Sequence, residues 1–212
     1  LKREIDFWNQ HYKNFKLDKS SQFALFIAKL IESTEIIIEL GCGNGRDSHC
    51  LASISTNYIG IDFSESAIQT AESRFSKNDL FGDNIKFEVN DYLKFLSYIP
   101  RSSGSEILVY SRFSLHSISE SEEDKLLHEF SKLASGSRIA LEVRTIRDPW
   151  FGVGQEVNRN AFVSDHFRRF IVPSELINKF EAFSKIECIS YGNNLARHNS
   201  ENPHVLRIIA RI

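Results

Sequence analysis

Short apolar runs alternate with longer amphipathic stretches along this chain. The runs have the length and β-branched character of strands, and they cover residues 35–40, 57–61, 85–89, 106–110 and 138–143. Between them, capping residues and apolar spacing predict helices over 45–54, from Ser64 onward and over 119–134. Ser119 and Glu122 match a capping box, and Gly136 marks a stop. Such alternation predicts a parallel sheet covered by helices on both faces.

The two ends of the chain differ from this rhythm. Two helical segments, about 2–12 and 21–31, precede the first strand. After a helix near 173–180 come two apolar runs, 185–191 and 204–212, with only a loop between them, so we expect an antiparallel pair. The predicted fold is one α/β domain with a doubly wound, mostly parallel sheet, an antiparallel C-terminal hairpin and an N-terminal helical cap.

Composition narrows the function classes. The 212 residues carry 26 basic and 28 acidic side chains, and 42% are hydrophobic, as in one globular domain. A formal charge of −2 argues against binding to nucleic acid, and no stretch approaches the roughly 18 apolar residues of a membrane span. Three cysteines without C-x-x-C spacing predict neither disulfides nor a metal site. We expect a cytoplasmic protein that inserts into no membrane and binds no nucleic acid; its oligomeric state stays open.

A glycine-rich turn follows the first strand directly and leads into a helix. Gly41, Gly43 and Gly45 are spaced G-x-G-x-G, and Arg46 stands where dinucleotide-binding turns have their third glycine. Glu39 precedes the turn, where a carboxylate would repel a pyrophosphate but favour an ammonium group. The turn therefore favours a cofactor other than a dinucleotide.

This arrangement resembles motif I of the class I S-adenosylmethionine-dependent methyltransferases, and matching strand ends continue the resemblance to about residue 143. The resemblance implies a seven-stranded Rossmann-like sheet and S-adenosylmethionine as cofactor. It implies that Asp62 accepts the ribose hydroxyls and that an N-terminal cap helix covers the cofactor with Tyr12. The full set of implied cofactor residues is Tyr12, Glu39, Gly41, Gly43, Arg46, Asp62, Phe63, Asn90, Asp91, Tyr92 and Ser111.

Arginines gather past the fourth and fifth strands, where open α/β sheets bind ligands. Residues 138–170 hold six arginines and no lysine, and arginine suits bidentate contact to phosphate or carboxylate. We therefore predict a small anionic acceptor under a long polar loop, with His166 and Arg169 on one face if that piece is helical. The predicted acceptor residues are Tyr12, Arg112, His116, Arg144, His166, Arg168 and Arg169. The neutral alternative is that the arginines pair with Glu142, Asp148 and Asp165 as structural bridges.

Methyl transfer requires alignment of the acceptor, and an amine acceptor must first lose its proton. His116, His166 or Asp91 could take that proton, and the sequence does not choose among them. The expected segments are cap helices over 1–34, a cofactor-binding core over 35–145, a substrate loop over 146–172, and the last helix and hairpin over 173–212.

Taken whole, the chain is similar to stand-alone bacterial small-molecule methyltransferases, either of the tellurite-resistance type or associated with capsule and surface-polysaccharide biosynthesis. Two other functions stay open. One is a cofactor-binding sensor or inactive partner subunit with the same fold. The other is a nicotinamide-dependent oxidoreductase, which Glu39 and the glycine spacing disfavour.

Overall fold

Seven strands form one sheet in the computed structural model, which describes residues 2–14, 19–31, 34–75, 84–99 and 106–212. Their order across the sheet is β3-β2-β1-β4-β5-β10-β9. The bounds are β1 Thr34–Leu40, β2 Ser55–Asp62, β3 Ile85–Val89, β4 Ile107–Arg112, β5 Arg138–Arg144, β9 Lys185–Gly192 and β10 Val205–Arg211. Strands β1 to β5 are parallel, whereas β10 is antiparallel to both β5 and β9. The predicted doubly wound sheet with its antiparallel hairpin is confirmed.

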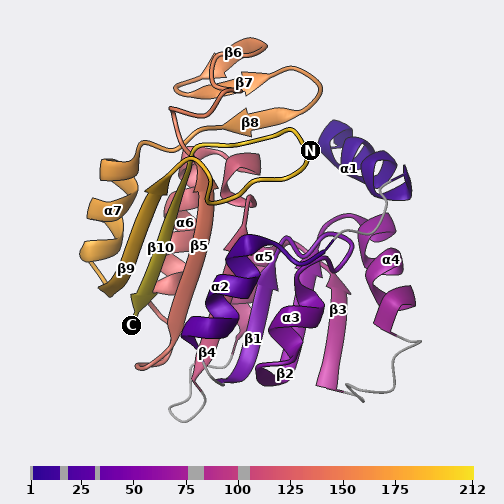
Figure 1. Cartoon of the computed structure of the whole chain (residues 1–212), viewed down its shortest axis with the longest axis vertical. Coiled ribbons are helices and arrows are strands. Elements are labelled where there is room, and N and C mark those ends of the chain that lie inside the picture. The colour runs from indigo at the N-terminus through magenta and orange to yellow at the C-terminus, as the bar shows by residue number, and fades with distance from the viewer. Residues whose placement is uncertain (1, 15–18, 32–33, 76–83, 100–105) are drawn as a thin grey trace.

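Helices cover both faces of this sheet (Figure 1). Their bounds are α1 Lys2–Asn14, α2 Gln22–Leu30, α3 Ser48–Ala52, α4 Glu65–Phe75, α5 Tyr92–Tyr98, α6 Glu120–Phe130 and α7 Pro173–Glu181. Phe23 of α2 and Leu51 of α3 are buried in the core of one face. Leu96 of α5, Phe130 of α6 and Phe180 of α7 are buried in the core of the other. Helix α1 packs against α4 at the end of the sheet where β1 to β3 finish.

Local hydrogen bonds explain where several helices begin. Ser119 and Glu122 form the predicted capping box at α6, and Ser64 Oγ accepts the N–H of Ala67 at α4. Helix α3 is shorter than the predicted 45–54, because the residues before Ser48 form a turn closed by Gly45 N–H and Cys42 O. Helix α5 was not predicted; Asp91 caps it by accepting the N–H groups of Leu93 and Lys94.

The prediction of a long loop between β5 and α7 is wrong, because this segment contains strands. It contains a second, antiparallel sheet of β6 (Gln155–Asn158), β7 (Ala161–Val163) and β8 (Phe167–Arg169), in the order β6-β7-β8. Phe151 lies 5.3 Å from Phe162 and 5.6 Å from Phe170 between ring centroids, so this sheet has a small aromatic core of its own. It is called the insert below.

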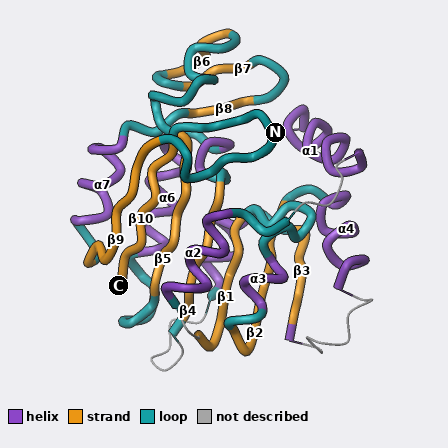
Figure 2. Tube along the Cα trace, viewed as in Figure 1, coloured by secondary structure: helices purple, strands orange, loops and turns teal. Residues whose placement is uncertain are grey.

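The insert, α1 and the loop before β10 surround the carboxyl ends of the parallel strands. In Figure 2 the loops gather between the upper ends of the main strands and the insert, with α1 at one side. None of the helices within the described ranges has the length and apolarity to cross a membrane. The arrangement places the loops after β1, β2, β4 and β5 at one edge, where open α/β sheets bind ligands.

Candidate functional site

The glycine-rich turn after β1 adopts a backbone that favours glycine. Gly41 and Gly43 have φ of 72° and 54°, which side-chain-bearing residues rarely adopt. The N–H groups of Gly41 and Cys42 both donate to Ile61 O, 2.8 and 3.0 Å away, which fixes the turn to the end of β2. The turn is therefore held rigidly at the end of β2.

Asp62 ends β2 and holds the same turn. Its Oδ2 accepts the N–H of Gly43 at 2.9 Å, and its Oδ1 accepts the N–H of Ser64 at 2.8 Å. Burial raises the pKa of Asp62 to about 6, although the backbone N–H groups act in the opposite direction. Each carboxylate oxygen has a second lone pair, so Asp62 can still accept hydrogen bonds from a ligand.

Glu39 lies on the face of β1 that α3 covers. Its carboxylate accepts hydrogen bonds from the Tyr58 hydroxyl and, at 3.3 Å, from Ser48 Oγ. Burial raises the pKa of Glu39, and nearby Asp47 adds to the shift. The predicted partner of Glu39 was an ammonium group; the structure gives it two hydroxyl donors, and contact with a ligand stays a prediction.

Helix α1 connects the turn with the insert. A Cβ built on Gly43 would lie 2.5 Å from Tyr12 Oη, so the Tyr12 ring lies against the turn. Asn9 Oδ1 accepts the Ser64 hydroxyl at 2.8 Å, near the start of α4. Toward the other side, the Glu4 carboxylate accepts the N–H of Phe167, at 3.2 Å for Oε1. One helix thus contacts both the turn and strand β8, which agrees with the predicted cap.

His116 and His166, two predicted acceptor residues, lie near each other in the fold. The ring of Phe7 of α1 lies tilted against His166, with ring centroids 4.3 Å apart, and His166 Nδ1 lies 3.3 Å from Asp165 Oδ1. Burial lowers the pKa of His166 to about 4. Burial also lowers the pKa of His116, and the further causes are Arg144, His166, Arg168 and Arg112. Both imidazoles are therefore neutral near pH 7. The three arginines and His166 that lower the pKa of His116 all lie close to it.

Arg112, Arg144 and Arg168 each have a carboxylate partner. Arg112 Nε lies 2.8 Å from Glu142 Oε1, and the other oxygen of Glu142 is shared with Arg207 at 2.7 Å. Arg144 binds Asp148 at 3.1 Å. The remaining pairs are Arg144 with Glu201 at 2.9 Å and Arg168 with Asp165 at 2.6 Å. The alternative hypothesis, that these arginines pair with carboxylates as structural bridges, is correct about the existence of the pairs. Whether the arginines also bind an acceptor stays a prediction.

Phe113 follows β4 in an unusual backbone conformation. Its φ is 58°, which is a genuine outlier for a bulky residue, and its N–H donates to Glu142 O at 2.9 Å. The guanidinium carbons of Arg112 and Arg144 lie 4.1 and 4.9 Å from the centre of its ring. Strained backbone of this kind concentrates at functional sites.

Arg169 is directed away from the other predicted acceptor residues. His166 and Arg169 would share one face if this piece were helical, but Arg169 lies in strand β8. Its guanidinium bonds Glu123 of α6 and, at 3.0 Å, Ile118 O. Arg168 instead extends over Trp150, at 5.2 Å from guanidinium carbon to ring centre.

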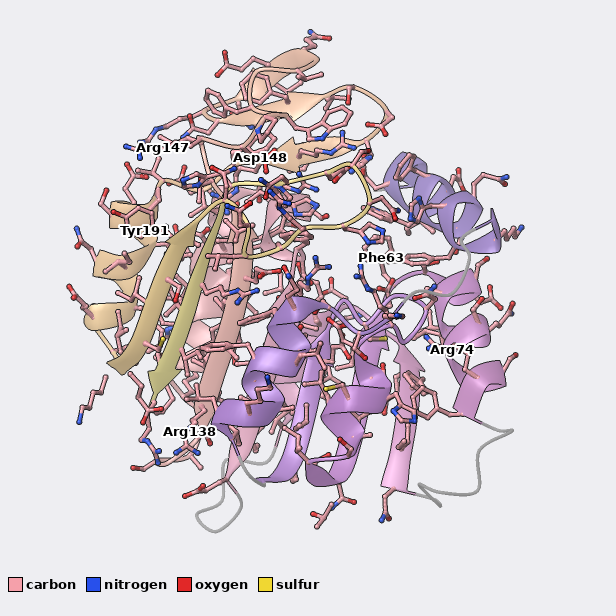
Figure 3. All side chains as sticks on the ribbon, viewed as in Figure 1. Phe63, Arg74, Arg138, Arg147, Asp148 and Tyr191 are labelled. Carbon is pink, nitrogen blue, oxygen red and sulfur yellow. The ribbon has the colours of Figure 1, made fainter. Side chains whose placement is uncertain are left out.

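Three predicted cofactor residues have structural contacts elsewhere. Arg46 Nε donates to Lys19 O at 2.9 Å, and Asp91 is exposed as the cap of α5. The N–H of Asn90 donates to Asp62 O at 3.0 Å. Phe63 directly follows Asp62 on the α1 side of the carboxyl edge (Figure 3). No contact with a ligand follows from these positions, so their roles stay predictions.

Several buried polar atoms lack a hydrogen-bond partner within the described part of the chain. They are Trp8 Nε1, Asn44 Nδ2, Tyr92 Oη, Ser111 Oγ and Nδ1 of both His116 and His166. Buried polar groups are normally paired, so this group needs an explanation. Tyr92 and Ser111 were predicted from the resemblance, whereas Asn44 and Trp8 were not. Trp150 and Asn9 were also missed, because only the folded chain reveals their partners.

Comparison with known proteins decides the family. A family model described as "Methyltransferase domain" matches residues 31–140, just over half of the chain. The chain belongs to this methyltransferase family. A solved SAM-dependent methyltransferase from Anabaena variabilis shares its fold, with a TM-score of 0.70, 16% identity, and coverage of 99% of this chain and 93% of that one.

Two curated relatives of this methyltransferase are mRNA cap guanine-N(7) methyltransferases. The one from Candida glabrata is 30% identical over 54% of this chain and 30% of its own length. The one from Saccharomyces cerevisiae is 27% identical over 84% of this chain and 37% of its own length. The chain thus spans about a third of the relatives that it matches. The finer likeness to bacterial small-molecule enzymes therefore stays a prediction.

S-adenosylmethionine is the cofactor of this methyltransferase, and the residues present fit it. A Cβ at Gly41 would lie 2.4 Å from Ser114 Oγ, and one at Gly43 would lie 2.5 Å from Tyr12 Oη, so only glycine permits this close approach to the turn. Asp62 retains acceptor capacity at the end of β2. The unpartnered Ser111 Oγ and Asn44 Nδ2 offer further polar contacts at the same edge. Within the described residues, no group of three histidines, cysteines or carboxylates is placed to hold a metal ion.

Proposed function

We propose that this methyltransferase transfers the methyl group of S-adenosylmethionine to a small acceptor that carries a phosphate or carboxylate. The acceptor lies between His116 and the insert, with its anionic group toward Arg144 and Arg168. This proposal uses the arginines that the sequence singled out, except Arg169, which we assign to the protein interior.

One observation carries the proposal, namely an excess of buried positive charge. The side chains of Arg112, Arg144, Arg168 and Arg207 are 14%, 12%, 17% and 7% exposed. Only two of their partners are equally buried, Glu142 and Asp148, both at 0%. Asp165 and Glu201 are 54% and 46% exposed, so water screens their charges. Buried Asp47 also acts on Arg112, so these four guanidinium groups of low exposure have three buried carboxylates among them. The remaining positive charge favours an anionic ligand, because charges removed from water require compensation.

Neutral imidazoles beside these arginines support a role in proton transfer. When bound, the cofactor supplies a methyl group on a positively charged sulfur. His116 is neutral, and its unpartnered Nδ1 can accept the proton that an acceptor hydroxyl or amine must release. His166 is the other candidate base, and Phe7 and Trp8 of α1 orient its ring and exclude water from it. Asp91 is the weakest candidate, since its carboxylate already accepts two N–H groups of α5.

The test is formation of S-adenosylhomocysteine with a panel of phosphorylated and carboxylated alcohols and amines, each paired with its uncharged analogue. We expect turnover on anionic members and inhibition by inorganic phosphate. Equal KM values for charged and uncharged members would contradict the anionic acceptor. Tight cofactor binding without turnover on any member would favour the sensor or partner-subunit alternative.

A nucleotide acceptor is the second candidate, because the two curated relatives named above are cap guanine-N(7) methyltransferases. Transfer to a guanine ring nitrogen requires no base, which suits histidines of lowered pKa. Guanosine nucleotides and a capped dinucleotide belong in the same panel. Methylation of these alone, with no small non-nucleotide anion accepted, would establish this candidate over the first.

A further inference from the structure

Trp150 lies on the insert beside the acceptor region and remains 39% exposed. The aromatic core of the insert consists of Phe151, Phe162 and Phe170, so it does not include Trp150. A single exposed aromatic is ordinary at a protein surface, and Phe151 is exposed to the same extent, so what distinguishes Trp150 is its link to two arginines.

The backbone of Trp150 is fixed to an acceptor-site arginine. Asp148 Oδ1 accepts the N–H of Trp150 at 2.9 Å, and the same carboxylate binds Arg144 at 3.1 and 3.2 Å. Asp148 is fully buried, and Figure 3 shows it at the base of the insert. The backbone of Trp150 is therefore held at a fixed position relative to Arg144 through Asp148.

The ring of Trp150 is fixed to a second arginine. Arg168 lies 5.2 Å from the ring centre, and its guanidinium bonds Ser164 and Asp165. Arg168 is one of the cations that lower the pKa of His116. Trp150 thus contacts Arg168 through its ring and is linked to Arg144 through the Asp148 carboxylate, and both arginines belong to the proposed anion site.

We infer that Trp150 is a specificity-determining residue, whose exposed indole surface stacks on a ring of the acceptor while Arg144 and Arg168 hold the phosphate joined to that ring. The inference rests on the proposed function and names its substrate class, a ring-bearing phosphate. Indole faces stack on nucleobases and on the apolar faces of sugars, so both nucleotides and sugar phosphates have the required chemistry.

The experiment measures binding by isothermal titration to the whole chain saturated with S-adenosylhomocysteine. The probes are guanosine 5′-monophosphate, glucose 1-phosphate and inorganic phosphate, which lacks a ring. We expect at least one ring-bearing probe to bind roughly tenfold more tightly than inorganic phosphate, as stacking contributes by alanine substitution. Preference for the nucleotide identifies a base, and preference for the hexose identifies a sugar.

Variants assign this preference to the indole. Trp150→Ala should remove the advantage of the ring-bearing probes and leave the affinities for inorganic phosphate and S-adenosylhomocysteine unchanged. Trp150→Phe should retain most of the advantage. Tyr191→Ala is the matched control, an exposed aromatic of strand β9 at 63% exposure that should change nothing. Trp8 and Trp150 are the two tryptophans of the chain, so fluorescence of a Trp8→Phe protein reports a ring at Trp150 directly.

Two failures are distinguishable. If inorganic phosphate binds and Arg144→Met weakens it, the proposed function stands. The inference is then overturned by ring-bearing probes that bind no better than phosphate, or by an advantage that survives Trp150→Ala. If no phosphate of any kind binds, the anionic acceptor itself is refuted, and the inference with it.

Discussion

Arg169 and Arg144 were predicted from one arginine-rich segment, and the structure separates their roles. Arg169 is 9% exposed and pairs with Glu123, which is 4% exposed. Removing one partner of a buried ion pair costs about 3–5 kcal/mol, because the other charge stays buried. Lys179 also binds Glu123, at 2.7 Å, so partial compensation places Arg169→Met near the lower limit of about 3 kcal/mol.

The assay is thermal unfolding together with phosphate titration. For a chain of this size about 1 kcal/mol shifts Tm by 2–4 °C, so Arg169→Met should lower Tm by about 6–12 °C. Its affinity for phosphate should equal that of the wild type. Arg144→Met should weaken phosphate binding strongly, whatever it does to Tm. Arg159→Met is the control, since its pair with Glu175 is exposed and should leave Tm unchanged.

The opposite result would refute this assignment. If Arg169→Met kept the wild-type Tm and lost phosphate affinity, the guanidinium would have to leave Glu123 and face the acceptor. The original expectation of one anion site containing Arg169 would then be correct.

Three other predictions concern the cofactor side. S-adenosylhomocysteine at 100 times its Kd should stabilise the chain by about 2.7 kcal/mol, and a Tm shift with NADH alone would contradict the cofactor assignment. Asp62 binds a proton in the folded chain between pH 3.8 and about 6 that the unfolded chain releases, so its contribution to stability falls as pH rises through that window. Asp62→Asn should therefore gain stability relative to wild type between pH 4 and pH 7, and a pH-independent difference in urea unfolding would show that Asp62 is ionised throughout. Gly43→Ala should weaken cofactor binding and lower Tm because the new Cβ meets Tyr12, whereas Gly152→Ala, also at positive φ but in open space, should change Tm alone.

The main sheet was predictable because its signals are local. Each parallel strand is a run of β-branched residues, and each predicted helix has its own cap or stop within a few positions. The strand ends of β1 and β2 could be matched to a known family because the glycine turn and Asp62 stand at fixed intervals. The structure brings Asp62 and Gly43 of this pattern together through a hydrogen bond, whereas the contact of Asp62 with ribose hydroxyls stays a prediction.

The insert was not predictable from pattern. Strand β6 is exposed along its whole length and shows no alternation, so no period distinguishes it from a loop. What holds the insert together is contact among Phe151, Phe162 and Phe170, which are spread over some twenty positions without helical or strand spacing. A small aromatic core of this kind exists only after the chain has folded back on itself.

Ion-pair partners were partly predictable, and the missed ones decide the chemistry. Arg144 and Asp148 are four residues apart, so that pair could be read from sequence. Glu201, which binds the same guanidinium, lies 57 positions away, and Glu4, which holds the N–H of Phe167, lies 163 positions away. Long-range partners determine which charges are buried and which remain in water. The sequence therefore shows how many arginines the segment has, but it does not show that they outnumber the buried carboxylates around them.

The alternation of side chains along strand β8 explains why Arg168 and Arg169 have different partners. Successive side chains of a strand point to opposite faces, so Arg168 and Arg169 cannot both reach the acceptor. His166 and Arg168 share the face toward α1 and Trp150, whereas Arg169 points to α6. A helix over the same residues would have grouped His166 with Arg169, which was the original expectation. Because the segment is a strand and not a helix, Arg168 takes the place of Arg169 in the proposed anion site. Trp150 lies beside Arg168.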